Sequence, residues 1–308
     1  MNNAVCVIVN PAAGRGRGAR VLPDVRRAFA RVGVDDVRIS SSKQDEKVVA
    51  RRAIADGRTT LAAVGGDGTW SNIANAILET GADVRLALLA AGTGNDFAKS
   101  VGAPARDLDA SARLAADGPD QRVDVGRIEN RYFLNIAGFG FDVAVLEDSE
   151  RVSFLRGNAV YIYSALRQLF GYRPSLIDLQ SVDGHHSLAK RLMLVIANAR
   201  HFGGAFHIAP FASITDGLLD AVSIADATAM RRLALFAAAA RGTHVKHAEV
   251  TIEQSSAFHL RFQSPPAYET DGEYHRAASA QIEVACLPGA LRIVTSAPPT
   301  APAGASRG

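Results

Sequence analysis

Three short apolar runs near the start of the chain each end in a glycine-rich turn, and a helix-like pattern follows each turn. The runs are "AVCVIVN" (4–10), "TTLAAVG" (59–65) and "VRLALLAAG" (84–92). A further short run, 36–40, falls between the first two. Strands and helices that alternate at this spacing are joined by right-handed crossovers and form a mostly parallel sheet. The sequence therefore predicts an α/β domain over residues 1–124.

The pattern of predicted secondary structure changes after this region. Short apolar strands, including one expected over residues 131–140, are separated by turn pairs such as Asp183-Gly184. This pattern predicts an antiparallel β domain over residues 125–296, with a last strand that could return to the first domain. Two helical insertions are expected at residues 151–171 and 228–242. The Pro/Ala/Gly-rich tail, residues 297–308, is expected to be disordered.

Composition limits the class of protein. A chain of 308 residues is long enough for two domains, and 48% apolar with 21% charged residues is typical of globular proteins. The net charge of +3 does not suggest nucleic-acid binding. Both cysteines, Cys6 and Cys286, lie in apolar runs, which favours free thiols in a reducing compartment. No apolar run is long enough to cross a membrane, so we expect a cytoplasmic protein that contacts a membrane only at its surface.

The second glycine turn, "AAVGGDGTWSNIANAI" (62–77), combines features that suit a phosphate with one that does not. Glycine lets the backbone approach a ligand closely, and the Thr69 hydroxyl can donate a hydrogen bond. Asp67 would repel a bare phosphate, but it fits a site in which Mg²⁺ lies between the carboxylate and the phosphate. The alternative is that Asp67 caps the helix expected to start near Thr69.

The first and third turns repeat this design. "VNPAAGRGRG" (9–18) exposes backbone N–H groups at a helix start, although it matches neither a P-loop nor the G-x-G-x-x-G spacing and could be a plain turn. In "LLAAGTGNDFAKSVG" (88–102), Thr93 could reach a phosphate, and Asp96 adds a carboxylate that could instead cap a helix. Three such turns would share the carboxyl edge of one sheet, where open α/β sheets bind ligands.

These three blocks, in this order, resemble the diacylglycerol kinase catalytic family of soluble bacterial lipid kinases. "RYFLNIAGFGFDVAV", "ANARHFGGAFHIAPFASITDGLLDAVSI" and "ETDGEYHR" are similar to later blocks of that family, so the resemblance covers about residues 4–296. It implies a Rossmann-like domain with the topology of NAD kinases and phosphofructokinases, followed by an antiparallel β-sandwich. It also implies that ATP and Mg²⁺ are used, in a cleft between the domains, to phosphorylate a lipid hydroxyl such as that of diacylglycerol.

The resemblance assigns roles to individual residues. Glu273 would be the catalytic base, with Asp67 and Asp96 around Mg²⁺ or the reacting centre. The nucleotide would be bound by Asn10, Ser40, Gly65, Gly66, Asp67, Gly68, Thr69 and Thr93. Without the resemblance, Asp271-Gly272 before the proposed base is first of all a hairpin turn.

A second, structural Mg²⁺ is also implied by the resemblance. Asp216 would bind it together with the backbone carbonyl groups of Ser213 and Leu218, although an ordinary Asp-Gly turn is the alternative. The chain departs from the family at Ser71-Asn72, where many members carry Asn-Glu. Ser40 or Ser41 stands where a threonine often occurs.

Other properties stay open at this stage. Residues 151–173 place apolar residues at helical spacing among arginines, which suits either an interfacial helix on a lipid surface or a helix packed on its own domain. An NAD or sugar kinase sharing the Gly-Gly-Asp-Gly-Thr turn is one alternative function. A nucleotide- or lipid-binding regulator without turnover is another, and a homodimer is compatible with the sequence.

Overall fold

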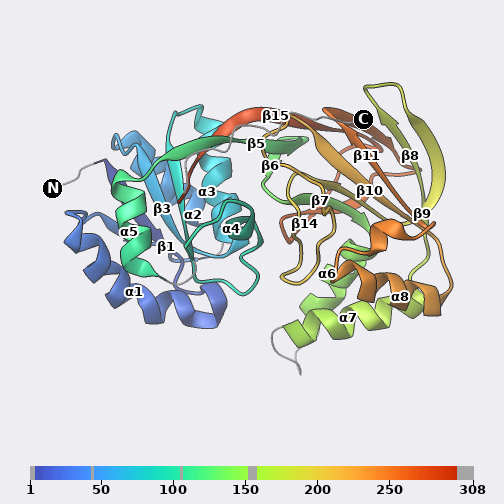
Figure 1. Ribbon diagram of the computed structural model, residues 1–308, viewed down its shortest axis with the longest axis horizontal. Coiled ribbons are helices and arrows are strands. Elements are labelled where there is room, and N and C mark those ends of the chain that lie inside the picture. Colours follow the sequence, from blue (N-terminus) through green and yellow to red (C-terminus); the bar gives the residue numbers. More distant parts are fainter. Residues whose placement is uncertain (1–3, 43–44, 105–106, 152–157, 297–308) are drawn as a thin grey trace. The chain divides into compact units, whose positions relative to one another are not determined.

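The computed structural model of the protein describes residues 4–42, 45–104, 107–151 and 158–296 (Figure 1). Contacts divide the chain into two compact units, Met1–Asp124 with Pro288–Gly308 and Val125–Leu287. They are called the α/β unit and the β unit below. The predicted tail and residues 152–157 of the predicted helical insertion lie outside the described residues.

The α/β unit is built on parallel strands in the order β4-β3-β1-β2. Its elements are β1 (Val5–Val9), α1 (Ala13–Arg31), β2 (Val37–Ile39), α2 (Asp45–Ala55), β3 (Thr60–Gly65), α3 (Asp67–Thr80), β4 (Arg85–Ala90), α4 (Asp96–Ser100), α5 (Leu108–Asp117) and the start of β5 (Asp120–Ile128). The end of β15 (Gln281–Val294) lies parallel to β4, with Arg292 opposite Arg85. The predicted parallel sheet is confirmed.

Helices cover both faces of this sheet, which explains why its strands are almost continuously apolar. On one face, Val7 and Val64 belong to a core cluster with Phe29 of α1 and Ala112 of α5. Helices α2 and α3 contact each other, and they also contact β1 and β3, respectively (Figure 1). This packing leaves the carboxyl ends of β1, β3 and β4 as the edge from which the glycine turns emerge.

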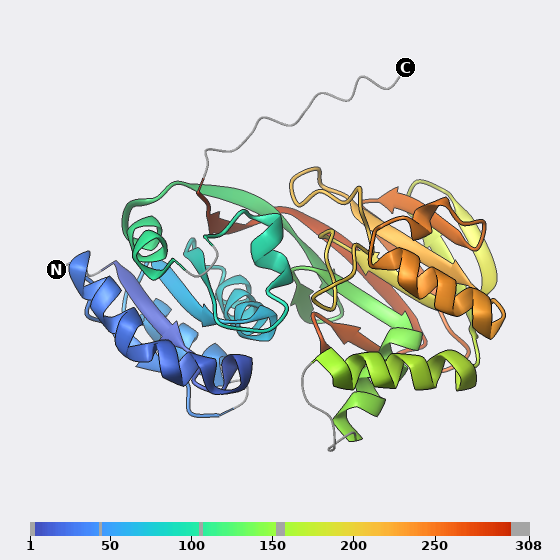
Figure 2. The same cartoon turned by 60° about the horizontal axis from the view of Figure 1, so that its bottom comes forward.

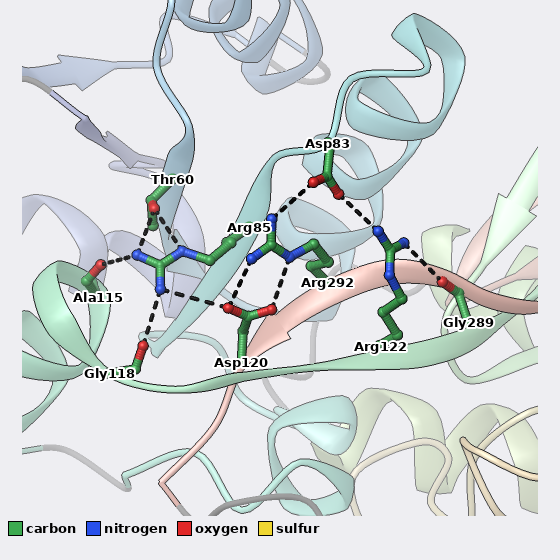
Figure 3. Close-up of polar contacts among 9 residues, drawn as sticks. All are labelled: Thr60, Asp83, Arg85, Ala115, Gly118, Asp120, Arg122, Gly289 and Arg292. Carbon is green, nitrogen blue, oxygen red and sulfur yellow. Dashed lines mark hydrogen bonds and ion pairs between the residues drawn. The ribbon is translucent and has the colours of Figure 1, made fainter.

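Ion pairs join β4, β5 and β15 within the α/β unit (Figure 3). Asp120 accepts hydrogen bonds from Nε and Nη2 of Arg292 at 2.8 and 3.0 Å, which hold the pKa of this carboxyl below its usual value. Asp83 accepts from both Arg292 and Arg122 at 3.0 Å, and Nη1 of Arg85 lies 3.7 Å from Asp120. Since β5 and β15 are the two segments that connect the units, these contacts fix the α/β-unit ends of both connections.

Over its described residues, the β unit is formed by antiparallel strands with three α-helices, and the antiparallel strands agree with its turn signals. Its elements are β6 (Arg131–Phe133), β7 (Ile136–Gly140), α6 (Phe141–Arg151), α7 (Asn158–Gly171), β8 (Ser175–Ser181), β9 (His186–Ala197), β10 (Leu219–Ala225), α8 (Ala229–Ala239), β11 (Val250–Ser255), β12 (Ala257–Arg261), β13 (Ala267–Thr270) and β14 (Glu273–Arg276), with the larger part of β15. The predicted antiparallel β architecture is confirmed.

Two local predictions in the β unit were wrong. The single strand expected over 131–140 is interrupted between β6 and β7, because the N–H groups of Leu134 and Asn135 donate to the side chain of Asp271 rather than to a neighbouring strand. The helical insertion begins ten residues earlier than expected, with α6 starting at Phe141 instead of residue 151. An apolar run that leads straight from a strand into a helix gave no signal for this boundary.

Helix α7 packs beside α8, as both ribbon views show (Figure 2). Ala165 and Leu169 of α7 are buried in a cluster with Leu235 of α8. Leu166 and Phe170, by contrast, are 39% and 69% exposed. Among the residues that the structure describes, no helix is long and apolar enough to cross a membrane.

Candidate functional site

The glycine turns of the α/β unit lie against one another. A β-carbon placed on Gly66 would lie 2.9 Å from the α-carbon of Gly92, and one placed on Gly14 would lie 2.1 Å from the carbonyl oxygen of Ala91. The amide of Gly92 also donates to the carbonyl of Gly65 at 2.9 Å. Side chains at these positions would push the turns apart. The prediction that the three turns gather at one edge of the sheet is therefore confirmed.

The first turn has an unusual backbone. Gly14, Arg15 and Gly16 have φ values of 55°, 58° and 78°, all in the left-handed region. For Arg15 this conformation is uncommon, because it brings the β-carbon of an L-residue close to its own backbone. The regular part of α1 thus begins only after Gly16.

Asp67 connects the second turn to the third. Its Oδ1 accepts a hydrogen bond from the backbone N–H of Phe97, in the first turn of α4, at 3.0 Å. Helix α3 starts at Asp67 itself, and the residue at its N-cap position is Gly66, which has no side chain to cap with. The Asp67 carboxylate thus serves the start of α4.

Asp96 is the first residue of α4 and is buried. Its Oδ1 accepts from Lys99 Nζ at 2.7 Å, and Asn95, which stands at the N-cap position, makes no side-chain cap. Thr93, in the same turn, is exposed. The third turn therefore presents a hydroxyl at the surface, next to a buried carboxylate that is paired with a lysine.

Asn10 joins the first turn to the second. Its Nδ2 donates to Thr69 Oγ1 at 3.0 Å and to Glu46 Oε1 at 2.6 Å, while its Oδ1 accepts from the N–H of Ala12 at 2.9 Å. Ser40 is buried beside the same edge, and its N–H donates to the carbonyl of Val9 at 3.0 Å. The predicted residues Asn10 and Thr69 are thus in contact.

The donors and acceptors of this edge fit a nucleotide phosphate with Mg²⁺. Gly68 has open space in the direction a side chain would take, and Thr93 is exposed, so a ligand can approach both. Asp67 and Asp96 supply the hard carboxylate oxygens that Mg²⁺ prefers. These hydroxyl, amide and carboxylate groups are compatible with a phosphate group and a divalent cation.

In the β unit, Glu273 begins β14 directly after the tight turn at Asp271-Gly272. The predicted hairpin is confirmed, since Thr270 of β13 pairs with Glu273. Asp271 adopts a left-handed φ of 50° and is buried. Its carboxylate accepts three backbone N–H bonds, from Leu134, Asn135 and Ile136 at 2.8, 2.8 and 3.2 Å. A buried charge with this many donors anchors the hairpin that carries Glu273.

A second acidic feature lies on the other strand of the hairpin. Glu269 of β13 and Asp142 of α6 are both buried, and both lie over Gly138, where a β-carbon would come within 1.7 Å of Asp142 Oδ2. Burial raises the pKa of Asp142 to about 7. Burial and the charge of Asp142 raise the pKa of Glu269 well above its usual value. Two carboxyls this close cannot both ionise easily, so they hold at least one proton near neutral pH.

The segment predicted to hold the structural metal forms an exposed turn. Asp216 Oδ1 accepts from the N–H of Leu218 at 3.1 Å, as in an Asx turn. Asp220 is buried nearby, and burial followed by the charge of Asp216 raises its pKa to about 6. Two neighbouring carboxyls with backbone carbonyls are donors that a hard cation prefers. Within the described part of the chain, no three His, Cys, Asp or Glu side chains gather as a metal cluster.

Two family models match adjoining parts of the chain. The diacylglycerol kinase catalytic domain matches residues 4–128, and the YegS C-terminal NAD kinase beta sandwich-like domain matches residues 135–295. The chain belongs to the diacylglycerol kinase family. Members of this family are lipid kinases, and the glycine turns lie in the part that matches the catalytic domain.

Named diacylglycerol kinases resemble the chain over most of its length. That of Mycobacterium tuberculosis (strain H37Rv) is 29% identical over 297 residues, which cover 94% of each chain. That of Staphylococcus aureus (strain RF122) is 26% identical over 277 residues, covering 89% of this chain and 87% of the relative. A crystal structure described as that of a "putative diacylglycerol kinase" from Bacillus anthracis (strain Sterne) has a TM-score of 0.78 at 20% identity, covering 96% and 95% of the two chains, and it supports the fold.

Sequence reasoning missed three acidic side chains of these sites, Glu46, Asp142 and Glu269, and the anchoring role of Asp271. One of them did leave a signal. Glu46 occupies the same helical face as the buried Ala50 and Ala53 of α2, and a glutamate on a buried face requires a partner. Asp142 and Glu269 come from distant segments, and the periodicity of the sequence does not indicate that they meet.

Proposed function

We propose that this diacylglycerol kinase family member transfers the γ-phosphoryl group of ATP to the hydroxyl group of diacylglycerol or a related lipid, giving phosphatidic acid or its analogue. The observation that carries the proposal is the contact between the second and third glycine turns. Gly66 and Gly92 touch, and Asp67 accepts from Phe97 N–H, so backbone amides, a hydroxyl and two carboxylates gather at one edge of a sheet. Phosphoryl transfer needs aligned phosphates, a metal and a carboxylate for the attacking hydroxyl.

The residue roles follow from this chemistry. The amides of the turn Gly65–Gly68, with the Thr69 and Thr93 hydroxyls, bind the nucleotide phosphates. Asn10 orients Thr69, and Ser40 lies directly after β2, between that strand and α2. Glu273 accepts the proton of the lipid hydroxyl as it attacks, because a carboxylate is a suitable base for an alcohol that is losing its proton in the transition state.

Two groups of oxygen ligands are proposed for Mg²⁺. Asp67 and Asp96 would hold an ion that neutralises the charge of the phosphates, which is the chemistry that the metal supplies when bound. Asp216, with the carbonyls of Ser213 and Leu218, would hold the structural ion. The neighbouring carboxyl of Asp220 supports the second site, because a cation would relieve its repulsion with Asp216.

A lipid acceptor also requires access to a membrane surface. Tyr163, Leu166 and Phe170 are exposed on α7 at intervals of three and four residues, so they lie on one side of the helix. Arg167 lies between them in the sequence, with its side chain 61% exposed while it pairs with Asp148. This supports peripheral contact with lipid head groups and upper acyl chains.

The test is transfer of radioactive phosphate from γ-labelled ATP. The protein would be incubated with a mixed lipid extract, and separately with NAD and with simple sugars, and each product would be identified by mass spectrometry. The proposal predicts a labelled lipid in an ATP- and Mg²⁺-dependent reaction. A labelled soluble product alone would show an NAD or sugar kinase, and tight ATP binding without any transfer would show a regulator.

A further inference from the structure

The buried carboxylate of Glu46 lies beside the predicted phosphate-binding residues. Its Oε1 accepts from Asn10 Nδ2 at 2.6 Å, and the same nitrogen donates to Thr69 Oγ1 at 3.0 Å. Glu46 is 2% exposed and Thr69 is 5% exposed. All three residues belong to the α/β unit. A buried acid that binds an amide group next to a phosphate turn needs an explanation, because its charge has the same sign as the ligand.

The direction of each hydrogen bond, from donor to acceptor, explains why an acid is found at this position. Asn10 Oδ1 accepts from the N–H of Ala12 at 2.9 Å, which fixes the amide group so that its nitrogen faces Glu46 and Thr69. An amide nitrogen has two hydrogens, one for each of these acceptors. Because Thr69 Oγ1 accepts from Asn10, its own hydroxyl hydrogen points away from Asn10 and can be donated to an anion. Glu46 thus orients the Asn10 amide and, through it, the Thr69 hydroxyl. The neutral Asn10 amide separates the carboxylate of Glu46 from the phosphate.

We propose that Glu46 is a positioning residue for nucleotide binding, which acts through Asn10 to present the Thr69 hydroxyl as a donor to a phosphate oxygen. This proposal rests on the proposed function of the glycine turns. The Glu46 carboxylate comes from the first turn of α2.

A purely structural role for Glu46 has to be separated from this one. Acidic residues in the first turn of a helix are stabilising, and Asp45 and Glu46 both occupy that turn of α2. Such an effect would change the stability of the unit without changing the affinity for a nucleotide. Binding of ADP with Mg²⁺ and the kinetic constants for ATP are therefore the decisive readouts, with thermal melting as the check on folding.

The variants are Glu46→Ala, Glu46→Gln and the matched control Glu79→Gln. Glu79 is an acid of the neighbouring helix α3 that pairs with Lys47 and Arg51 of α2 and does not belong to the proposed site. Glu46→Gln keeps a side chain of the same size and an acceptor oxygen but loses the charge. It should fold even if the alanine variant does not.

Glu46→Ala should weaken binding of ADP with Mg²⁺, and lower kcat/KM for ATP, by roughly 10- to 100-fold, the range expected for a hydrogen bond to a charged group. Glu46→Gln should lose roughly 10-fold or less, since a neutral acceptor is weaker. The KM for the lipid should not change in either variant. Folded Glu46 variants that bind ADP as tightly as Glu79→Gln would overturn the proposal.

A spectroscopic measurement tests the contact itself. The side-chain NH₂ signals of Asn10 in the nitrogen–proton NMR spectrum, assigned through their loss in Asn10→Asp, should shift in Glu46→Gln and stay in place in Glu79→Gln. Unchanged signals in Glu46→Gln would contradict the inference. If the wild type phosphorylates no lipid while ADP binding still depends on Glu46, the proposed function fails and the positioning role stands.

Discussion

The carboxylate of Asp67 accepts a hydrogen bond from the backbone N–H of Phe97, 30 residues further along the chain, at 3.0 Å. This contact joins the turn after β3 to the start of α4 after β4. The Asp67 carboxylate therefore has a structural role, as the acceptor for Phe97 N–H, in addition to its proposed role as a metal ligand. The two tasks can be separated, because one needs an acceptor oxygen and the other needs a negative charge.

Replacing Asp67 should therefore have different effects on stability and activity. Asp67→Asn keeps an oxygen for Phe97 N–H, so the free energy of unfolding should change little, while kinase activity should fall about 100-fold or more through loss of the metal ligand. Asp67→Ala should lose the same activity and also about 1 kcal/mol of stability. Urea denaturation and steady-state kinetics measure the two effects, and an active Asp67→Asn enzyme would remove Asp67 from the metal site.

Asp271 should be needed for the stability of its hairpin. Oδ2 accepts from Leu134 N–H, and Oδ1 accepts from Asn135 and Ile136 N–H. Asp271→Asn tolerates the left-handed backbone but sets an NH₂ group against at least one of these donors, so the free energy of unfolding should fall by about 1–3 kcal/mol. Amide hydrogen exchange at residues 134–136 should accelerate. Unchanged protection of these amides would mean that the carboxylate does not anchor them.

The pair of Asp142 and Glu269 should make stability depend on pH. The folded-state pKa of Asp142 is raised from its usual 3.8 to about 7, so the native state binds more protons than the unfolded state between these values. The stability that this group contributes is fully present below about pH 4 and is lost as pH rises towards about 7. Asp142→Asn should flatten this slope in urea denaturation series, and Asp117→Asn, at an exposed site on α5, should not. An identical slope in Asp142→Asn would contradict the assignment.

The proposed structural metal can be tested by thermal melting. An ion bound at 100 times its Kd stabilises the folded state by about 2.7 kcal/mol, so Mg²⁺ should raise the melting temperature of the wild type by several degrees. Asp216→Ala should lose most of this increase. The matched control is Asp183→Ala, at another Asp-Gly turn of the β unit, and it should keep the increase. Equal increases in both variants would place the ion elsewhere.

Much of the fold follows from local pattern. The glycine turns meet because the carboxyl ends of neighbouring parallel strands lie at one edge of a sheet, and the order of apolar runs already predicts such strands. The Asp271-Gly272 hairpin follows from its turn residues in the same way. Asn10 and Thr69 could therefore be assigned to one edge before their contact was seen.

Contacts between distant segments could not be predicted. The break at Leu134 and Asn135 depends on a carboxylate that arrives more than 130 residues later, and the apolar pattern of residues 131–140 continues through the break without a signal. The proton-sharing pair of Asp142 and Glu269 depends on Gly138, whose missing side chain makes room for Asp142. Such features come from packing, and periodicity alone does not report them.

The most direct test of the whole account is the phosphorylation of diacylglycerol in mixed vesicles by wild type and Glu273→Gln, with binding of ADP and Mg²⁺ measured on the same samples. The account predicts that kcat falls by about 10²- to 10⁴-fold, the usual contribution of a general base, while the affinity for ADP is unchanged. A Glu273→Gln enzyme that phosphorylates diacylglycerol at the wild-type rate would contradict the assignment of the base. A wild type that transfers no phosphate to any lipid would contradict the proposed function itself.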